Sequence, residues 1–250
     1  MDQIEAIRVI VNGAKGKMGL AACETINAHQ DFTLVAALSR EDDLRAEIIK
    51  HRAQIVIDLT RADCVFDNSM AILESGAYAV IGTSGLTDTQ LDQLDHLCHE
   101  KSLGAIVAPN FSISAVLMMR FAAEAARFLP EVEIIEMHHQ QKYDAPSGTA
   151  LKTAEMIGLQ RCEITQKQPA SHETISGVRG GRYQNIAIHS LRLPGVVARQ
   201  DVIFGNVGET LTISHNSIDR KSFMPGVVLC CQKVMSLQKL CYGLETILDF

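Results

Sequence analysis

The sequence predicts an α/β fold, in which a parallel, doubly wound sheet is followed by a second domain of α+β type with a mixed sheet. Three observations lead to this prediction. In the first 110 residues, short apolar and β-branched runs alternate with helical patterns. After Pro109 a long helical run replaces that alternation. Toward the C-terminus, three strand-like runs follow one another with only short turns between them, which is typical of an antiparallel or mixed sheet.

Glycines, prolines and periodicity bound the elements of the first region. Its strand-like runs are almost continuously apolar, which indicates strands buried on both faces of a parallel sheet. The helical runs between them show a repeat close to the helical period. We expect strands at residues 7–11, 33–38, 54–59, 78–82 and 105–108, and helices from residue 13 to about 28, at 65–75 and at 91–101.

The second region begins with a helical run that ends before Pro130. Residues 160–184 are polar and contain glycines, so we expect a long loop there. The last apolar run is predicted to be one helix, because Pro225 falls in its first turn, where no N–H is needed. We expect helices at 114–128, 151–159 and 224–240, and strands at 132–137, 185–192, 200–204 and 210–215.

The composition limits the class of protein. The 250 residues suffice for one large domain or two modest ones, and 47% of them are hydrophobic. The net charge of -6 argues against a dedicated nucleic-acid binder but allows a small anionic ligand held by local cations. No signal peptide and no apolar stretch approaching about 18 residues is apparent. The seven cysteines include no C-x-x-C pair. We therefore expect a cytoplasmic protein with reduced thiols, no membrane span and no metal site.

A glycine-rich stretch, VNGAKGKMG, joins the first predicted strand to the first helix. Its first glycine permits a sharp turn, its second lets the backbone approach a pyrophosphate, and its third, Gly19, lets helix and strand pack closely. The spacing is G-x-x-G-x-x-G, so a tight turn without a ligand is the alternative to a Rossmann-like dinucleotide site. The candidate cofactor-binding residues are Gly13, Ala14, Lys15, Gly16, Lys17 and Met18.

The end of the second predicted strand bears on which dinucleotide is bound. An acid at this place would bind the ribose hydroxyls and repel a 2′-phosphate. Here the chain reads Ser39 and Arg40, which can bind that phosphate, so the sequence favours NADPH over NADH. In the alternatives, Arg40 stacks on the adenine of either cofactor or lies in solvent, or Glu41 or Asp42 turns toward the ribose.

The stretch EMHHQQKYDAPSGTA, residues 136–150, combines groups that packing alone would not require. His138 and His139 end a predicted strand, so their side chains point to opposite sides. A turn can bring Lys142 into one pocket with one of these histidines. Ser147 is a plausible helix N-cap, and the amides after it can bind a carboxylate or phosphate. The set suits protonation of an anionic substrate.

Other interpretations of these residues stay open. The two histidines can be metal ligands, although no partner stands at helical spacing, or core residues bonded to the backbone. Ser-Gly-Thr can be a helix cap alone. Arg192 and Arg220 are further candidate cations for a substrate, or solvated surface side chains.

Residues 136–150 resemble the signature of the dihydrodipicolinate reductase family, E-x-H-H-x-x-K-x-D-x-P-S-G-T-A. Three other stretches are similar to motifs of the same family. VNGAKGKMG resembles its N-terminal glycine loop, GTSG at 82–85 resembles its G-T-[TS]-G, and APNFS at 108–112 resembles its A-[PA]-N-F-S. The four stretches lie in the family's order, and the resemblance extends from about residue 7 to about residue 220.

The resemblance implies an NADPH- or NADH-dependent reduction of 4-hydroxy-tetrahydrodipicolinate to tetrahydrodipicolinate, on the route to diaminopimelate and lysine. It implies that His138 and Lys142 are proton donors. The implied residues that bind the dicarboxylate substrate are His139, Ser147, Gly148 and Thr149, and those near the nicotinamide are Gly82, Thr83, Ser84, Ala108, Pro109, Asn110 and Phe111.

The resemblance also implies the organisation of the chain. Residues 1–110, completed by 221–250, would form the dinucleotide-binding domain, and 111–220 a substrate-binding and oligomerisation domain of a homotetramer.

One alternative is another nicotinamide-dependent dehydrogenase with the same two-domain plan. The other is a non-catalytic nucleotide-binding sensor, which would not need the His-His-Lys set beside an anion-binding helix end.

Overall fold

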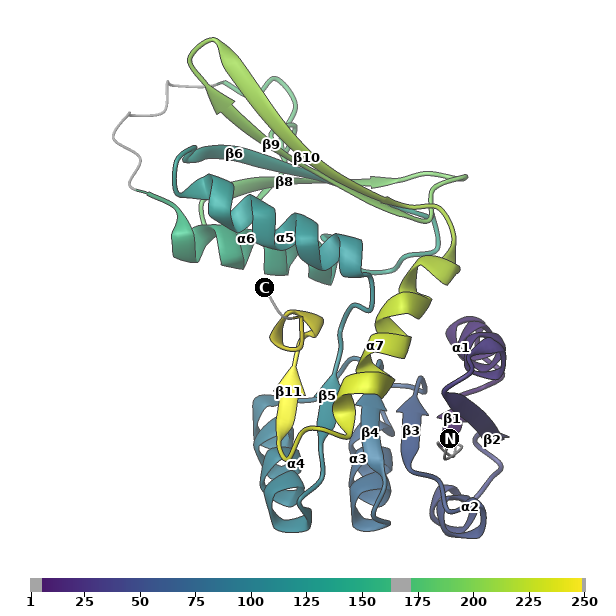
Figure 1. Ribbon diagram of the computed structural model, residues 1–250. Helices are drawn as coiled ribbons and strands as arrows, with labels where there is room; N and C mark the ends of the chain where they lie inside the picture. Colours follow the sequence, from purple (N-terminus) through teal and green to yellow (C-terminus); the bar gives the residue numbers. More distant parts are fainter. Residues whose placement is uncertain (1–5, 163–171, 249–250) are drawn as a thin grey trace. The chain divides into compact units, whose positions relative to one another are not determined.

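The computed structural model describes residues 6–162 and 172–248 of the chain (Figure 1). It divides into two compact units. The first consists of Met1–Ile113 together with Phe223–Phe250, and the second is Ser114–Ser222. Each unit contains one sheet, and the two sheets differ in topology.

The sheet of the first unit has six parallel strands in the order β11-β5-β4-β3-β1-β2. Strand β1 lies between β2 and β3, so the order reverses beside it. In open α/β sheets, ligands bind at the carboxyl ends of the strands around such a reversal. The strands are β1 (Ile7–Asn12), β2 (Phe32–Leu38), β3 (Ile55–Asp58), β4 (Tyr78–Ile81), β5 (Ala105–Val107) and β11 (Leu240–Tyr242).

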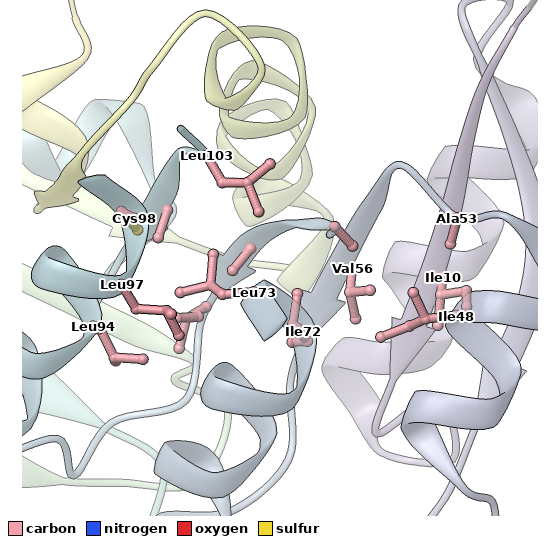
Figure 2. Close-up of a cluster of buried hydrophobic side chains, with 14 of the residues drawn as sticks. Ile10, Ile48, Ala53, Val56, Ile72, Leu73, Leu94, Leu97, Cys98 and Leu103 are labelled. Carbon is pink, nitrogen blue, oxygen red and sulfur yellow. The ribbon is translucent and has the colours of Figure 1, made fainter. Parts of the chain in front are cut away.

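Apolar side chains cover both faces of this sheet, as the continuous apolar runs predict. On one face, Ile10 and Val56 belong to a buried cluster with Ile72 and Leu94 from the helices (Figure 2). The residues that alternate with them, Val9, Val11, Ile55 and Ile57, are also fully buried. The surrounding helices are α1 (Lys17–Ala28), α2 (Leu44–His51), α3 (Val65–Glu74), α4 (Asp88–Lys101) and α7 (Met224–Val234).

In the first unit, helix α2 was not predicted, and the start of helix α4 was predicted too late in the chain. Helix α2 lies in a stretch so rich in charges that its apolar face is short, with Ile48 as its one buried residue. Asp43 starts this helix by accepting a hydrogen bond from the amide of Ala46. Helix α4 begins at Asp88 rather than at residue 91, because Thr87 and Gln90 cap it reciprocally.

The prediction of one helix over residues 224–240 is wrong. Helix α7 ends at Val234, and the chain then forms β11 beside the edge of β5. Ser236 donates a side-chain hydrogen bond to the carbonyl of Lys233, which satisfies a helix-end carbonyl. Asp95 then accepts a hydrogen bond from the amide of Leu240 at 2.8 Å. Pairing with β5 thus replaces the last turns of the predicted helix.

The sheet of the second unit is mixed, in the order β10-β9-β6-β8-β7, and only β6 and β8 are parallel. Helices α5 (Ile113–Ala126) and α6 (Gly148–Gln160) lie along one face of it (Figure 1). The buried residues Val132, Ile134 and Glu136 alternate along β6. The strands are β6 (Glu131–His138), β7 (Gly181–Tyr183), β8 (Ile186–Arg192), β9 (Ala198–Asn206) and β10 (Glu209–Ser217).

The long loop predicted at residues 160–184 is only partly correct. Helix α6 extends to Gln160, and Gly181–Tyr183 forms the short edge strand β7, which pairs antiparallel with β8. Residues 163–171 of the predicted loop lie outside the described residues. Strands β9 and β10 are also longer than predicted, because their antiparallel ladder continues to the turn at residues 207–208.

Over residues 6–162 and 172–248, no helix is long and apolar enough to cross a membrane. The cysteines are free, and burial varies among them, from buried Cys230 to exposed Cys162. Burial raises the pKa of Cys98 and of Cys230 to about 12, so these thiols stay protonated at neutral pH.

Candidate active site

The glycine loop, residues 13–19, leaves the end of β1 in a geometry that side chains would block. Gly13 has a φ of 85°, and a Cβ there would lie 2.5 Å from the carbonyl oxygen of Leu59. A Cβ at Gly19 would lie 2.2 Å from the carbonyl oxygen of Gly13. The N-cap of α1 is Gly16, which has no side chain to occupy the first amides of the helix. The loop therefore fits the pyrophosphate of a dinucleotide.

The six candidate residues of this loop are not equivalent. The amides of Gly13 and Ala14 donate to the carbonyl of Leu38 at 3.0 and 2.9 Å, which ties the loop to the end of β2. Lys15 and Lys17 are exposed, Ala14 is buried and Met18 is half-buried. The two lysines thus place positive charge at the surface of the loop, while its buried residues set the turn.

The end of β2 carries a carboxylate from further along the chain. Asp42 accepts hydrogen bonds from the amide of Ser39 at 2.8 Å and from its hydroxyl at 3.1 Å. These bonds, the backbone one foremost, lower the pKa of Asp42. Glu41 lies 3.8 Å from Lys15, and Arg40 is exposed. The structure therefore brings the carboxylate of Asp42 to Ser39.

Segments 82–84 and 108–111 follow β4 and β5, which are neighbouring strands, so both lie at the same edge of the sheet. A Cβ at Gly82 would lie 2.4 Å from the ring of Phe111 and 2.7 Å from the side chain of Leu59. The amide of Ala108 donates to the carbonyl of Ile81 at 2.8 Å. Ser84 and Pro109 are exposed, Asn110 is half-buried and Thr83 is buried. The structure thus brings these two predicted segments together.

A second group of predicted residues lies in the other unit, at the carboxyl end of β6. Glu136 and His138 are two residues apart on this strand and therefore share a face. His138 Nδ1 lies 2.6 Å from Glu136 Oε2. Because an ionised carboxylate can only accept, Nδ1 carries the proton of this bond, and Nε2 is the nitrogen left to exchange a proton with a ligand.

Arg192, the last residue of β8, completes the surroundings of Glu136. Its two terminal nitrogens donate to the two oxygens of Glu136 at 2.9 and 2.8 Å. The same nitrogens donate to the carbonyls of Leu191 and Asp144, each at 2.7 Å. Arg192 is thus not the solvated surface side chain that sequence allowed. Most of its donors serve the protein itself.

The Glu136 carboxylate is fully buried and ionised. Burial alone would raise its pKa, but hydrogen bonds from His138, Arg192 and Ser190 together outweigh burial and lower the pKa to about 2. At neutral pH this carboxylate is therefore ionised, and it holds Nδ1 of His138 and the guanidinium of Arg192.

Lys142 lies in the turn that follows β6. Its ammonium donates to both oxygens of Asp144 at 2.8 and 2.9 Å. This pairing lowers the pKa of Asp144, which is exposed. The carbonyl of Asp144 in turn accepts from Arg192, so the turn is tied to the Glu136 cluster. Lys142 and His138 belong to one network, but no hydrogen bond joins them directly.

Helix α6 begins as predicted, with Ser147 as its N-cap. The Ser147 hydroxyl accepts from the amide of Ala150 at 3.2 Å, and the Ser147 amide donates to Glu136 at 3.2 Å. Glu136 therefore ties the start of α6 to the end of β6. Gly148 is exposed, whereas Thr149 and His139 are half-buried. The first turn of α6 thus presents Gly148 to solvent beside the predicted site.

Two important residues were missed from sequence. Glu136 was read only as part of a strand, and Asp58, the last residue of β3, was not singled out. Asp58 is fully buried and accepts side-chain hydrogen bonds from Asn12, which directly precedes the glycine loop, and from Thr83, which belongs to segment 82–84. The sequence signal for Asp58 is an acid that ends an otherwise apolar strand. Glu136 gives no such signal, because β6 also contains Glu131 and Glu133 and continues to His138. Over the described ranges, no group of three or more His, Cys, Asp or Glu is placed to hold a metal ion.

Comparisons with known proteins cover nearly the whole chain. Residues 7–111 match the family model "Dihydrodipicolinate reductase, N-terminus", and residues 114–248 match "Dihydrodipicolinate reductase, C-terminus". A 4-hydroxy-tetrahydrodipicolinate reductase from Legionella pneumophila (strain Lens) is 61% identical over 96% of this chain and 99% of its own. One from Coxiella burnetii (strain Dugway 5J108-111) is 52% identical over 97% and 100%.

A solved structure agrees with these matches. The dipicolinate-bound dihydrodipicolinate reductase from Paenisporosarcina sp. TG-14 has a TM-score of 0.88 and 42% identity, over 97% of this chain and 100% of that one. D-galactose-1-dehydrogenase from Rhizobium etli, at 12% identity and a TM-score of 0.63, shares the fold alone.

Proposed function

The chain belongs to the dihydrodipicolinate reductase family, as a nicotinamide-dependent oxidoreductase that reduces 4-hydroxy-tetrahydrodipicolinate in lysine and diaminopimelate biosynthesis, and we propose that His138 and Lys142 supply the protons of this reduction. The observation that carries the proposal is the buried Glu136 carboxylate, which holds His138 through Nδ1. A nicotinamide cofactor supplies the hydride, and the protein must then supply a proton.

His138 suits the role of acid because of what Glu136 does to it. The bond to Nδ1 fixes the orientation of the ring, and the carboxylate stabilises the ring when it is protonated. The His138 side chain is 16% exposed, enough for Nε2 to meet a substrate. After Nε2 gives up its proton, the neutral ring keeps its bond to Glu136, so the ring need not turn.

Lys142 is the mobile cation of the site in this proposal. Arg192 already serves Glu136 and two carbonyls, so its charge is largely neutralised by the protein. Within residues 6–162 and 172–248, the Lys142 ammonium is bonded to the exposed carboxylate of Asp144 alone, which water can solvate when the lysine leaves. A dicarboxylate substrate then takes the place of Asp144 as the partner of Lys142.

We propose that the other carboxylate of the substrate binds at the start of α6. Helix amides and the helix dipole favour an anion there, and Gly148 offers its amide without a covering side chain. The name of the dipicolinate-bound relative supports a dicarboxylate ligand. The residues proposed to bind it are His139, Ser147, Gly148 and Thr149.

The glycine loop, Ser39 with Arg40, and segments 82–84 and 108–111 are proposed to hold the cofactor, with NADPH favoured over NADH. The absence of an acid at the end of β2 itself supports NADPH, as do Arg40 and the exposed lysines of the loop. Asp42 opposes it, since its carboxylate occupies the donors of Ser39. Binding of a 2′-phosphate therefore requires Asp42 to release Ser39.

We further propose that residues 1–110 with 221–250 serve the cofactor and residues 111–220 serve the substrate and assembly. The free cysteines support the proposed location in a reducing compartment, the cytoplasm.

The proposed assembly is a homotetramer. Sedimentation of the purified protein tests the assembly, because a monomer across the working concentration range contradicts it.

One assay tests the reaction as a whole. The unstable substrate is made in place by a dihydrodipicolinate synthase, and the oxidation of NADPH and of NADH is followed by absorbance. We expect oxidation that depends on both the synthase and this chain. Without any oxidation of either cofactor, the proposal fails.

A further inference from the structure

We propose that Asp58 is a positioning residue that holds the glycine loop and segment 82–84 in the geometry that binds the nicotinamide cofactor. The inference rests on the proposed role of these two segments in cofactor binding. Asp58 itself is fully buried at the end of β3, so its action on a cofactor is through the residues it holds.

The Asp58 carboxylate accepts hydrogen bonds from four residues. Its Oδ1 accepts from the hydroxyl of Thr83 at 2.9 Å, the hydroxyl of Thr60 at 2.7 Å and the amide of Thr60 at 3.2 Å. Its Oδ2 accepts from the side-chain amide of Asn12 at 3.0 Å and from that of Asn68 at 2.9 Å. All these donors are neutral, so the charge is stabilised by hydrogen bonds and not by a salt bridge.

One of the four donors directly precedes a predicted cofactor segment, and another belongs to one. Asn12 ends β1 and precedes Gly13, and Thr83 is the second residue after β4. Both side chains are buried, so each needs an acceptor, and Asp58 supplies it to both. A single carboxylate on the central strand β3 thereby joins the carboxyl ends of both its neighbours.

Backbone contacts also pack the glycine loop and segment 82–84 tightly against the residues at the end of β3. The amide of Leu59 donates to Asn12, and the amide of Gly82 donates to the carbonyl of Asp58, both at 2.9 Å. The missing side chains of Gly13 and Gly82 leave just enough space for Leu59. Packing therefore stops the segments from moving inward, and the bonds to Asp58 stop them from moving outward.

A role in stability alone is the alternative, and Asn68 provides the matched control. Asn68 lies on α3, belongs to no proposed cofactor segment, and donates to the same oxygen as Asn12. The variants Asp58→Asn, Thr83→Val and Asn68→Ala are compared by thermal unfolding without cofactor. Their dissociation constants for NADH and NADPH are measured by calorimetric titration, so no turnover is involved.

In Asp58→Asn, the new amide nitrogen would face the side-chain amides of Asn12 and Asn68, so both would lose their acceptor. We expect the dissociation constants of NADH and NADPH each to rise at least about tenfold, which corresponds to about 1.4 kcal/mol of binding free energy. Thr83→Val should weaken both cofactors to a smaller extent. Asn68→Ala should lower the unfolding temperature but change both constants less than about twofold.

The exchange variant Asn12→Asp with Asp58→Asn provides the rescue, because it restores one carboxylate–amide bond between β1 and β3. We expect cofactor affinity to recover at least in part. If Asp58→Asn does not fold, Thr83→Val and the exchange variant carry the same comparison.

The wild-type constants are measured first, which separates the two proposals. If wild type binds neither cofactor, the proposed function fails. If wild type binds and Asp58→Asn binds equally well, or if Asn68→Ala weakens binding as much, Asp58 has no positioning role.

Discussion

Two buried carboxylates, Asp58 and Glu136, lie at or near the carboxyl ends of strands in the two sheets but are held by different kinds of partner. Each ends or nearly ends a strand and is fully buried. Asp58 is surrounded by neutral hydroxyl and amide donors. Glu136 is bonded to His138 and Arg192, which carry or acquire positive charge. The first carboxylate therefore organises shape, whereas the second controls charge.

This difference follows from what each sheet has to present. A nucleotide loop acts mainly through backbone amides, so it needs fixed geometry and no titrating group. An acid catalyst must change charge during each turnover, so it needs a counter-charge that remains in place. Glu136, with a pKa of about 2, stays ionised throughout the neutral range and provides that counter-charge.

The largest effect is expected from the group that Glu136 orients. In His138→Gln the amide can accept or donate a hydrogen bond but cannot supply a proton at neutral pH. We expect kcat to fall about 100- to 10,000-fold, while the dissociation constants of NADPH and NADH stay within about twofold of wild type. Steady-state rates and calorimetric titration measure the two quantities.

Lys142→Ala is the companion variant for the same comparison. It should also lose turnover without losing cofactor affinity, because the Lys142 ammonium is paired with the exposed carboxylate of Asp144. If cofactor affinity collapsed in both variants, the two residues would be structural. The proposed difference between Asp58, which holds the cofactor segments, and Glu136, which stabilises charge, would then be wrong.

The two carboxylates should also differ in how much stability is lost when each is replaced by its amide. Glu136→Gln leaves Arg192 without its carboxylate, which should cost about 3–5 kcal/mol in the free energy of unfolding. Asp58→Asn strands no cation, so its cost should be smaller. Urea unfolding of both variants measures the difference.

The double variant Glu136→Gln with Arg192→Met is the control for that measurement. It removes both charges, so most of the lost stability should return, but kcat should stay low because His138 still lacks its counter-charge. Equal costs at positions 58 and 136 would contradict the distinction drawn between them.

How much of this could be read from the sequence depends on how local each signal is. The strands of the parallel sheet were predicted because their apolar runs are continuous, and the N-cap Ser147 because it stands directly before its helix. Strand β11 of the same sheet was not predicted, because its three residues form a strand only through pairing with β5. The roles of Asp58 and Glu136 depend on partners as distant as Asn12 and Arg192, 46 and 56 residues away along the chain.

Acid provides a further way to test the comparison. Because the folded-state pKa of Glu136 is about 2, below the ordinary 4.5, its stabilising effect is complete above about pH 4.5 and is lost as the pH falls toward 2. The total loss is on the order of 3 kcal/mol. We expect the free energy of unfolding to fall more steeply over this range in wild type than in Glu136→Gln with Arg192→Met. Parallel slopes would show that Glu136 is not the group responsible.

The smallest effect is expected at Asp42, because its carboxylate is exposed and solvent screens its electrostatic interactions more than those of the buried Asp58 and Glu136. Asp42→Asn removes the negative charge at Ser39, so a 2′-phosphate should be tolerated better. We expect NADPH affinity to rise about threefold to tenfold relative to NADH. Arg40→Ala should move the ratio the other way, because Arg40 is the proposed partner of that phosphate. Equal changes for both cofactors in both variants would mean that the end of β2 does not distinguish them, and that cofactor choice is made by the exposed lysines of the glycine loop.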